Sequence, residues 1–536
     1  MTTLILLQRA TVLTHDESDH VVPLYDTDVL IRGNIIAAIG KELQSALDGD
    51  VDVIDCWGKI ISPGYVDTHH HVWQTQLKGR HAEEGLVAYM VTGKNLFAST
   101  ASRTWPLILY FRLGNMMSYA YTTSDIYWGQ LSGCLEAMNA GTTTVLDHSH
   151  AGYTAAHVSS AVDATIDSGI RSVFAYAIPV RMAKWDQSSC VLNEELMVSW
   201  AFSQIEQLAS KYNSPESSHR LEIGYGFDWW FLPKDVSLDI FKRLRKSGVR
   251  LVTSHVGKNG FQGMQTKVSK LESYGVLRPP YPPSEKTPEL PFFVFSHCNG
   301  YSSDELSVLS RTGTSISSTP DTEAQMGIGY PVVLHPSLNT GARKANVGLG
   351  IDCHSIVPSS IILQARALLH LTRVEHNSSI TAAGKFPAWN VRNTSEDAFN
   401  IATIKGARSL GLDGEIGSIK VGKKADIVIF DALNSVGMLS AAEYDPVVAI
   451  VRFSEAADID TVIVDGIVRK RGGRLVDVKS SRIKGMIMPW QKVAQQVRQS
   501  QREIQARIDG LNIEKGKETL FNTFHTDGST LADATI

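Results

Sequence analysis

Eight short apolar runs alternate with longer mixed segments between residues 63 and 414, and this alternation limits the possible folds more than any other feature. The runs are rich in β-branched and aromatic residues, and the segments between them are long enough to hold helices. Strand and helix repeated eight times predict a closed parallel barrel of the (β/α)8 TIM type. The expected strands are the run through Val66 and residues 141–148, 171–177, 221–227, 250–255, 292–297, 314–318 and 347–352.

Further β-rich segments lie on both sides of the predicted barrel. Apolar runs at 4–14, 27–40 and 51–56 precede it, and runs at 422–430 and 461–469 follow it. We expect these two parts to combine into one small β-sandwich domain beside the barrel. The predicted division is residues 1–62 and 415–480 for this composite domain, 63–414 for the barrel, and 481–536 for a C-terminal helix and tail.

The C-terminal segment contains an amphipathic pattern. Apolar residues at Val493, Val497, Ile504 and Ile508 recur at helical spacing, which predicts a helix over 490–511. We expect this helix to pack on its own barrel, with a contact in a dimer as the alternative. The polar tail after Asn522 is expected to be loose.

Composition excludes several classes of protein. The chain has 536 residues, a formal net charge of −4 and 20% charged residues, so no basic excess indicates nucleic-acid or membrane binding. No apolar stretch approaches the ~20 residues of a membrane-spanning helix. The five cysteines are an odd number without a CxxC pair, which favours a reducing compartment. We therefore expect a cytoplasmic protein that acts on a small molecule, as a homo-oligomer and most simply a dimer.

Histidine and aspartate residues end several of the predicted strands. His69 and His71 end the first, His255 the fifth, His297 the sixth and Asp352 the eighth. The carboxyl ends of barrel strands share one face, where active sites of this fold lie. Three imidazoles and a carboxylate can hold a catalytic transition metal such as Zn²⁺ or Fe²⁺ and leave a position open for water.

Longer motifs carry a resemblance to a known family. The chain resembles the amidohydrolase superfamily, in its branch of cytosine-deaminase-like and triazine-hydrolase-like enzymes. The matching motifs are Pro63-Gly-Tyr-Val-Asp-Thr-His-His-His-Val-Trp-Gln74, Gly141-Thr-Thr-Thr-Val-Leu-Asp147, Ser296-His297, Gly350-Ile-Asp352, Ala407-Arg-Ser-Leu-Gly-Leu412 and Gly417-Ser-Ile-Lys-Val-Gly-Lys-Lys-Ala-Asp426. The resemblance covers the chain from about Leu4 to Val476.

The resemblance implies a site and a mechanism. His69, His71, His255 and Asp352 would bind one metal, His297 would contact the attacking water or the substrate, and Asp352 would also accept a proton from that water. Binuclear relatives carry a carboxylated lysine at the end of the fourth strand, whereas this chain continues there into Asp228-Trp-Trp230. One metal is therefore expected, Zn²⁺ first and Fe²⁺ second.

One residue departs from the pattern of the deaminases. They carry a glutamate three residues after the fifth-strand histidine, where this chain has Lys258. Its ammonium would favour an anionic substrate group or a developing oxyanion, so we expect a catalytic role for Lys258 and poor activity on standard nucleobases.

Further residues are candidates for contact with the substrate. Trp73 and Gln74 follow the first strand, His148 and His150 end the second, and Glu323 follows the seventh. His148, His150 and Glu323 can also replace the missing glutamate, and each can equally be a structural hydrogen-bonding residue.

These observations predict a metal-dependent amidohydrolase that hydrolyses a C–N bond of a small cyclic or aromatic nitrogen compound. Two alternatives remain open at this point. The first is a lyase, a decarboxylase or (de)hydratase, on the same metal site, and the second is a binding protein that has lost catalysis.

Overall fold

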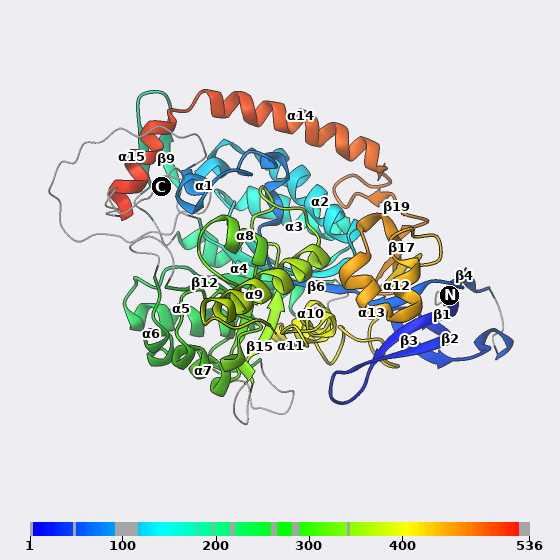
Figure 1. Cartoon of the computed structure of the whole chain (residues 1–536). Coiled ribbons are helices and arrows are strands. Elements are labelled where there is room, and N and C mark those ends of the chain that lie inside the picture. Colours follow the sequence, from blue (N-terminus) through cyan, green and yellow to red (C-terminus); the bar gives the residue numbers. More distant parts are fainter. Residues whose placement is uncertain are drawn as a thin grey trace.

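The computed structural model describes residues 4–46, 50–91, 116–179, 181–193, 195, 198–214, 220–258, 265–280, 289–339, 344–387 and 389–524. Its centre is a closed barrel of parallel strands, in the order β11-β12-β13-β14-β15-β6-β7-β8 (Figure 1). The predicted (β/α)8 barrel is confirmed. The strands are β6 (Tyr65–His70), β7 (Thr142–Ser149), β8 (Arg171–Ala177), β11 (Leu221–Gly226), β12 (Leu251–Val256), β13 (Phe292–His297), β14 (Ser315–Ser318) and β15 (Asn346–Leu349).

Helices between the strands cover the outside of the barrel. Several begin at side-chain caps that the sequence encodes, as at Thr122 and Ser302, where the cap and the third helical residue exchange hydrogen bonds. The helices are α2 (Thr123–Asn139), α3 (Ala155–Ser168), α4 (Ser199–Tyr212), α5 (Lys234–Lys246), α6 (Val268–Ser273), α7 (Ser303–Thr312), α8 (Pro320–Gln325), α9 (Ile361–Ala382), α10 (Ser395–Ala402) and α11 (Ile404–Ser409).

Strands from both ends of the chain form one hydrogen-bonded sheet beside the barrel, drawn in blue and orange in Figure 1. Its own apolar cluster includes Leu7, Val12, Ile61 and Ile427, all fully buried. The sheet contains β1 (Leu4–His15), β2 (Val21–Arg32), β3 (Ile35–Gly40), β4 (Asp52–Asp55), β5 (Ile60–Pro63), β16 (Ile427–Phe430), β17 (Ile459–Val464), β18 (Ile467–Arg471) and β19 (Arg474–Leu475).

The remaining elements are short. They are α1 (Leu86–Val91), α12 (Leu439–Tyr444), α13 (Pro446–Val448), the 3-10 or π turns η1 (Leu43–Ala46), η2 (Val72–Leu77), η3 (Met116–Ala120), η4 (Pro336–Asn339), η5 (Ala449–Phe453) and η6 (Ala456–Asp458), and the strand pairs β9 (Met182–Trp185) with β10 (Cys190–Leu192) and β20 (Val478–Lys479) with β21 (Ile487–Met488). Among the described helices, none has the length and apolar content needed to cross a bilayer.

The predicted C-terminal helix is α14 (Trp490–Asp509), which crosses the top of the molecule in Figure 1. Ser500 on its inner face donates to Asp125 of α2 at 2.5 Å and accepts from Gln76 of η2 at 3.0 Å. The helix therefore packs on its own barrel, as expected, and the dimer stays a prediction. A second helix, α15 (Ile513–Phe524), follows where the sequence analysis placed no helix. The tail beyond it, residues 525–536, lies outside the described residues.

Candidate active site

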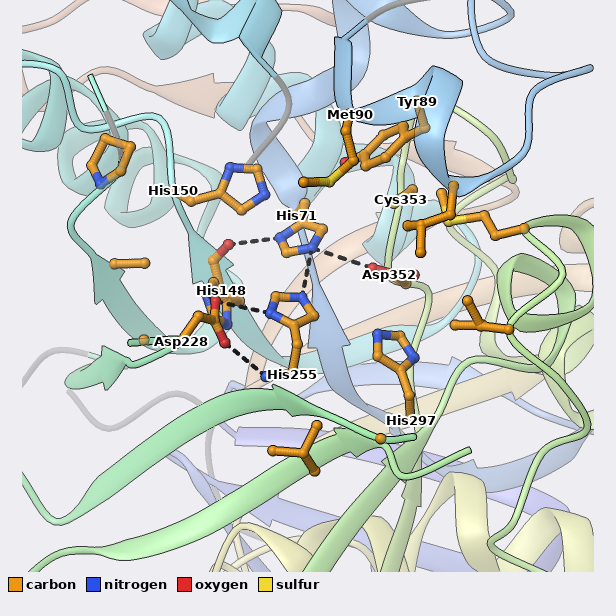
Figure 2. Close-up of a pocket in the computed structure, with 18 of the residues that line it drawn as sticks. His71, Tyr89, Met90, His148, His150, Asp228, His255, His297, Asp352 and Cys353 are labelled. Carbon is orange, nitrogen blue, oxygen red and sulfur yellow. Dashed lines mark hydrogen bonds and ion pairs between the residues drawn. The ribbon is translucent and has the colours of Figure 1, made fainter. Parts of the chain in front are cut away.

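The four predicted metal ligands meet at the carboxyl end of the barrel. The side chains of His69, His71, His255 and Asp352 each place one nitrogen or oxygen atom within 4.8 Å of the others. The Oδ1 atom of Asp352 lies 3.3 Å from Nε2 of His69 and 3.2 Å from Nε2 of His71. Nε2 of His71 lies 3.3 Å from Nε2 of His255, and Figure 2 shows these rings and the carboxylate pointing toward one another.

The backbone at the seam between β6 and β15 brings three of these residues together. The Asp352 N–H donates to the His69 carbonyl at 2.8 Å, and the His71 N–H donates to the Asp352 carbonyl at 2.9 Å. Gly350 permits this close approach, because a Cβ atom there would lie 2.5 Å from the His69 carbonyl oxygen. Asp352 has a φ of 63° and His297 a φ of 74°, a left-handed backbone that non-glycine residues rarely adopt outside functional sites.

Hydrogen bonds orient two of the imidazoles. Nδ1 of His71 lies 2.8 Å from the carbonyl oxygen of His148, which can only accept, so Nδ1 carries the proton. Nδ1 of His255 lies 3.0 Å from Oδ2 of Asp228, which selects the same tautomer. In both rings the unprotonated Nε2 therefore faces the other ligands.

Burial and close partners set the charge of the four groups. Burial lowers the pKa of His69 well below its usual value and that of His255 to about 3, so both rings are neutral at pH 7. Burial acts to raise the pKa of Asp352, but its contacts with His69 and His71 outweigh this and hold the pKa well below its usual value. His69 and His255 thus present neutral imidazoles beside the carboxylate of Asp352.

This donor set fits a divalent metal ion. Four donors placed about 2.0–2.1 Å from one tetrahedral ion lie roughly 3.3–3.4 Å apart, close to the three separations given above. Both ring nitrogens of His69 are buried, and the Nε2 atom lies against the Asp352 carboxylate at 3.3 Å. A buried polar atom needs a partner, and an ion held between these four groups would bind one nitrogen of His69.

A pocket opens above the cluster. The polar part of its described wall consists of His71, His148, His150, Asp228, His255, His297, Asp352 and Asn299, all but the last labelled in Figure 2. The larger apolar and aromatic side chains of the wall are Leu86, Tyr89, Met90, Ile178, Pro179, Trp229, Val256, Met326 and Ile328, and Ala177, Gly226, Gly257 and Cys353 complete it. No lysine or arginine is among the described residues of this wall, and Asp228 and Asp352 are its two carboxylates.

His297 and Glu323 lie together at one side of the pocket. Nδ1 of His297 lies 3.3 Å from Oε1 of Glu323 and 3.2 Å from Oγ1 of Thr319. Glu323 is fully buried and is absent from the described pocket wall, and burial raises its pKa. Glu323 therefore supports His297 in this geometry, while a direct contact of Glu323 with the substrate stays a prediction.

The second-strand histidines both reach the pocket. His148 is fully buried at the end of β7, with Nε2 at 3.2 Å from Oδ2 of Asp228. His150 lies against His71, with ring centroids 4.2 Å apart, and burial lowers its pKa well below the usual value. Both line the pocket, and their predicted contact with the substrate stays a prediction.

Trp73 and Gln74 lie behind the wall. Trp73 is fully buried against Tyr121 and His150. Gln74 donates to the hydroxyl of Tyr89 at 2.7 Å and accepts from the backbone N–H of Ser355 at 3.3 Å, and it thereby holds a residue that does line the pocket. Neither side chain is part of the described wall, so their predicted contact with the substrate has no support from this geometry.

Lys258 turns away from the cluster. Its Nζ atom donates to Oε2 of Glu305 at 2.6 Å, and Glu305 belongs to the capping box that begins α7. The Lys258 side chain is 39% exposed and absent from the described pocket wall. The expectation that its ammonium meets the substrate is not supported by this placement and remains a matter for kinetics.

Asp228 is a site residue that was not predicted from the sequence. Asp228 follows β11 and contacts His255 and His148. Its position in the sequence could have indicated this role, because Asp228 is a carboxylate that follows the fourth predicted strand. The other candidate residues also lie at the carboxyl ends of the predicted strands. The α1 residues Leu86, Tyr89 and Met90 were also missed, because an apolar segment far from the strand ends shows no chemical pattern.

Known proteins are similar to this chain in sequence and in fold. A sequence model of the Amidohydrolase family matches residues 60–225 and 293–468. The 5'-deoxyadenosine deaminase of Methanobrevibacter smithii is 25% identical over 469 residues, which are 85% of this chain and 91% of that protein.

Solved structures agree in fold. A variant of atrazine chlorohydrolase TrzN from Arthrobacter aurescens TC1, complexed with zinc and atraton, has a TM-score of 0.69 at 18% identity and covers 93% of this chain and all of its own (100%). An adenosine deaminase from Xanthomonas campestris with bound zinc has a TM-score of 0.67 at 17% identity, covering 94% and 98%. The chain belongs to the amidohydrolase family and is an enzyme that hydrolyses carbon–nitrogen bonds other than peptide bonds.

Proposed function

We propose that the protein hydrolyses a C–N bond of a small cyclic or aromatic nitrogen compound at one divalent metal, with Zn²⁺ as the expected ion and Fe²⁺ as the alternative. The observation that carries this proposal is the convergence of His69, His71, His255 and Asp352 on one point below the pocket. The zinc present in two solved relatives supports the choice of ion.

Asp352 and His297 have different roles in the proposed reaction. An ion held by His69, His71, His255 and Asp352 would lower the pKa of a bound water molecule toward neutrality and so would supply hydroxide at pH 7. Asp352 holds its carboxylate form because of its imidazole partners, and it orients the water and accepts its proton. His297, supported by Glu323 and Thr319, donates or accepts a hydrogen bond at the substrate.

The pocket favours a neutral or cationic substrate. Its described wall carries two carboxylates and no lysine or arginine, so no described side chain there offers a positive charge to an anionic group. Tyr89, Trp229 and Met90 offer apolar faces suited to a planar ring. This charge pattern differs from the anionic substrate that Lys258 suggested from the sequence alone.

The chain lacks the glutamate that deaminases carry three residues after the fifth-strand histidine, and this affects which substrates it can protonate. Lys258 stands at its position and is ion-paired to Glu305, so no carboxylic acid at this position protonates a ring nitrogen. We therefore keep the expectation that cytosine, guanine and adenine are poor substrates. The lyase alternative depended on Lys258 reaching the substrate, and its pairing with Glu305 removes the observation that favoured it.

A substrate screen tests the proposal. Purified, zinc-loaded protein is incubated with neutral and cationic ring amines, lactams and cyclic amidines, and with matched carboxylates. We expect turnover only among the uncharged or cationic compounds. Mass spectrometry should detect one added water when a lactam or cyclic amidine ring opens, and replacement of the amino group by oxygen, with release of ammonia, for exocyclic amines. Release of carbon dioxide, or elimination without water uptake, would assign the protein to the lyases, and binding without turnover would leave it a binding protein.

Location and assembly rest on the sequence. We propose that the enzyme works in the cytoplasm, where its five cysteines, all free thiols in the structure, would remain reduced. We also propose a homodimer, which sedimentation of the purified protein tests directly.

A further inference from the structure

Asp228, which follows the end of β11, uses both oxygens of its carboxylate to contact the proposed ligand His255 and its neighbours Ser254 and His148. Its Oδ1 atom accepts from the backbone N–H of His255 at 2.9 Å and from Oγ of Ser254 at 3.4 Å. Its Oδ2 atom lies 3.0 Å from Nδ1 of His255 and 3.2 Å from Nε2 of His148. One carboxylate thus contacts both the backbone and the ring of a proposed ligand.

We infer that Asp228 is the positioning residue of the metal centre, which fixes the tautomer and the orientation of His255. A hydrogen bond at Nδ1 leaves the lone pair on Nε2, and Nε2 is the atom that lies 3.3 Å from Nε2 of His71. The negative charge of Asp228 also increases the basicity of the ring as a ligand. The backbone bond to His255 fixes the end of β12 at the same time.

The surrounding residues are shaped for this arrangement. The His148 ring fits beside Asp228 only because residue 226 is a glycine, since a Cβ atom there would lie 2.9 Å from Nε2 of His148.

A second ion is the competing explanation, because His148, Asp228 and His255 also place three donor atoms within 4.8 Å of one another. Two features disfavour it. His255 would have to bind one ion through each nitrogen, which requires a fully deprotonated ring. Oδ1 of Asp228 already accepts two hydrogen bonds, and Oδ2 faces the Nδ1–H group of His255. One ion, with Asp228 outside its ligand shell, accounts for the contacts.

The test measures metal binding, so it does not depend on knowing the substrate. The inference rests on the proposed role of His255 as a ligand, and wild-type protein that binds no metal would defeat the proposed function itself. Wild-type, Asp228→Asn and Glu222→Gln proteins are titrated with Zn²⁺ against a chelating dye. Glu222 is the matched control, because it is a carboxylate on the same strand β11 and pairs with Arg250 instead of the site.

We expect Asp228→Asn to lose about 10- to 100-fold in zinc affinity, the range found when an outer partner of a ligand is removed. Its Co²⁺ form should show an altered visible spectrum, whereas Glu222→Gln should match wild type in both measurements. Equal affinity in Asp228→Asn, or an equal loss in Glu222→Gln, overturns the inference. If Asp228→Asn does not fold, the stoichiometry of the wild-type protein decides: one tightly held ion supports the inference, and two overturn it.

Discussion

Asp352 has two tasks at the residue scale, as a metal ligand and as the acceptor of the proton from water. Replacement by asparagine keeps an oxygen that coordinates weakly but removes the base. We expect Asp352→Asn to lower kcat by about 10²–10⁴-fold, the usual contribution of a general base, while metal content falls far less. Parallel measurements of kcat and of bound metal check this. Equal proportional losses would leave Asp352 as a ligand only.

Lys258 gives a second prediction at this scale. Its ammonium pairs with Glu305 and is absent from the described pocket wall. An exposed pair of this kind contributes little to stability, about 0–1 kcal/mol. We expect Lys258→Ala to retain its metal and to keep kcat within about threefold of wild type, in contrast to the roughly hundredfold loss that an oxyanion role implies. A loss near a hundredfold would restore the catalytic role expected from the sequence.

The part of the site formed by histidine and aspartate residues at strand ends could be predicted from the sequence. His69, His71, His255 and Asp352 lie at the ends of the first, fifth and eighth apolar runs, and the fold brings these ends to one face. Lys258 shows the limit of this reasoning, because its nearness in sequence to His255 did not reveal its partner on α7. Asp228 was missed because its role depends on contacts between three separate strands.

At the scale of elements, α15 links the chain terminus to the pocket. Leu520 on α15 is fully buried, and a Cβ atom on Gly516 would lie 3.2 Å from a Val91 side-chain atom of α1. The same α1 contributes Leu86, Tyr89 and Met90 to the pocket wall. The helix α15 therefore supports one side of the proposed substrate site.

Truncating Leu520 tests this packing. We expect Leu520→Ala to lower the free energy of unfolding by about 2–5 kcal/mol, since it removes buried methyl groups and leaves a cavity. Urea denaturation measures the effect, and Glu518→Ala, at an exposed position of the same helix, serves as the control. Deleting the residues after Asn522 keeps Leu520 and should leave activity intact. Unchanged stability in Leu520→Ala would show that α15 does not dock.

Helices and strands could be predicted from the sequence where their apolar residues recur with a clear period. The barrel strands and α14 carry clear periodicity, so they could be placed from the sequence. The helices α1 and α15 are short, and packing against each other and against Trp185 stabilises them more than their own sequence does. Such elements depend on contacts that a local pattern does not contain.

At the scale of the whole molecule, buried neutral histidines make stability depend on pH. Burial lowers the pKa of His81 to about 3 and that of His354 to about 4. Between these values and about 6.5 the unfolded chain binds protons that the folded protein does not, so stability falls as the pH falls through this window. Each such histidine contributes about 1.4 kcal/mol per pH unit there.

Urea denaturation of metal-stripped protein at pH 7.5, 6 and 5 checks this slope, since few carboxylates titrate in this range. His81→Gln should flatten it, because His81 lies outside the proposed ligand set and contacts Ser355. Stability that rises or stays level from pH 6.5 to 5 would show that these rings are protonated in the folded state.

The metal content of the active protein tests the central claim most directly. Four donors from three barrel strands meet at one point, and we predict about one Zn²⁺ or Fe²⁺ per chain, measured by elemental analysis alongside activity. Chelation should remove metal and activity together, and one equivalent of metal should restore both. Full activity in metal-free protein, or two tightly held ions per active chain, would contradict the account.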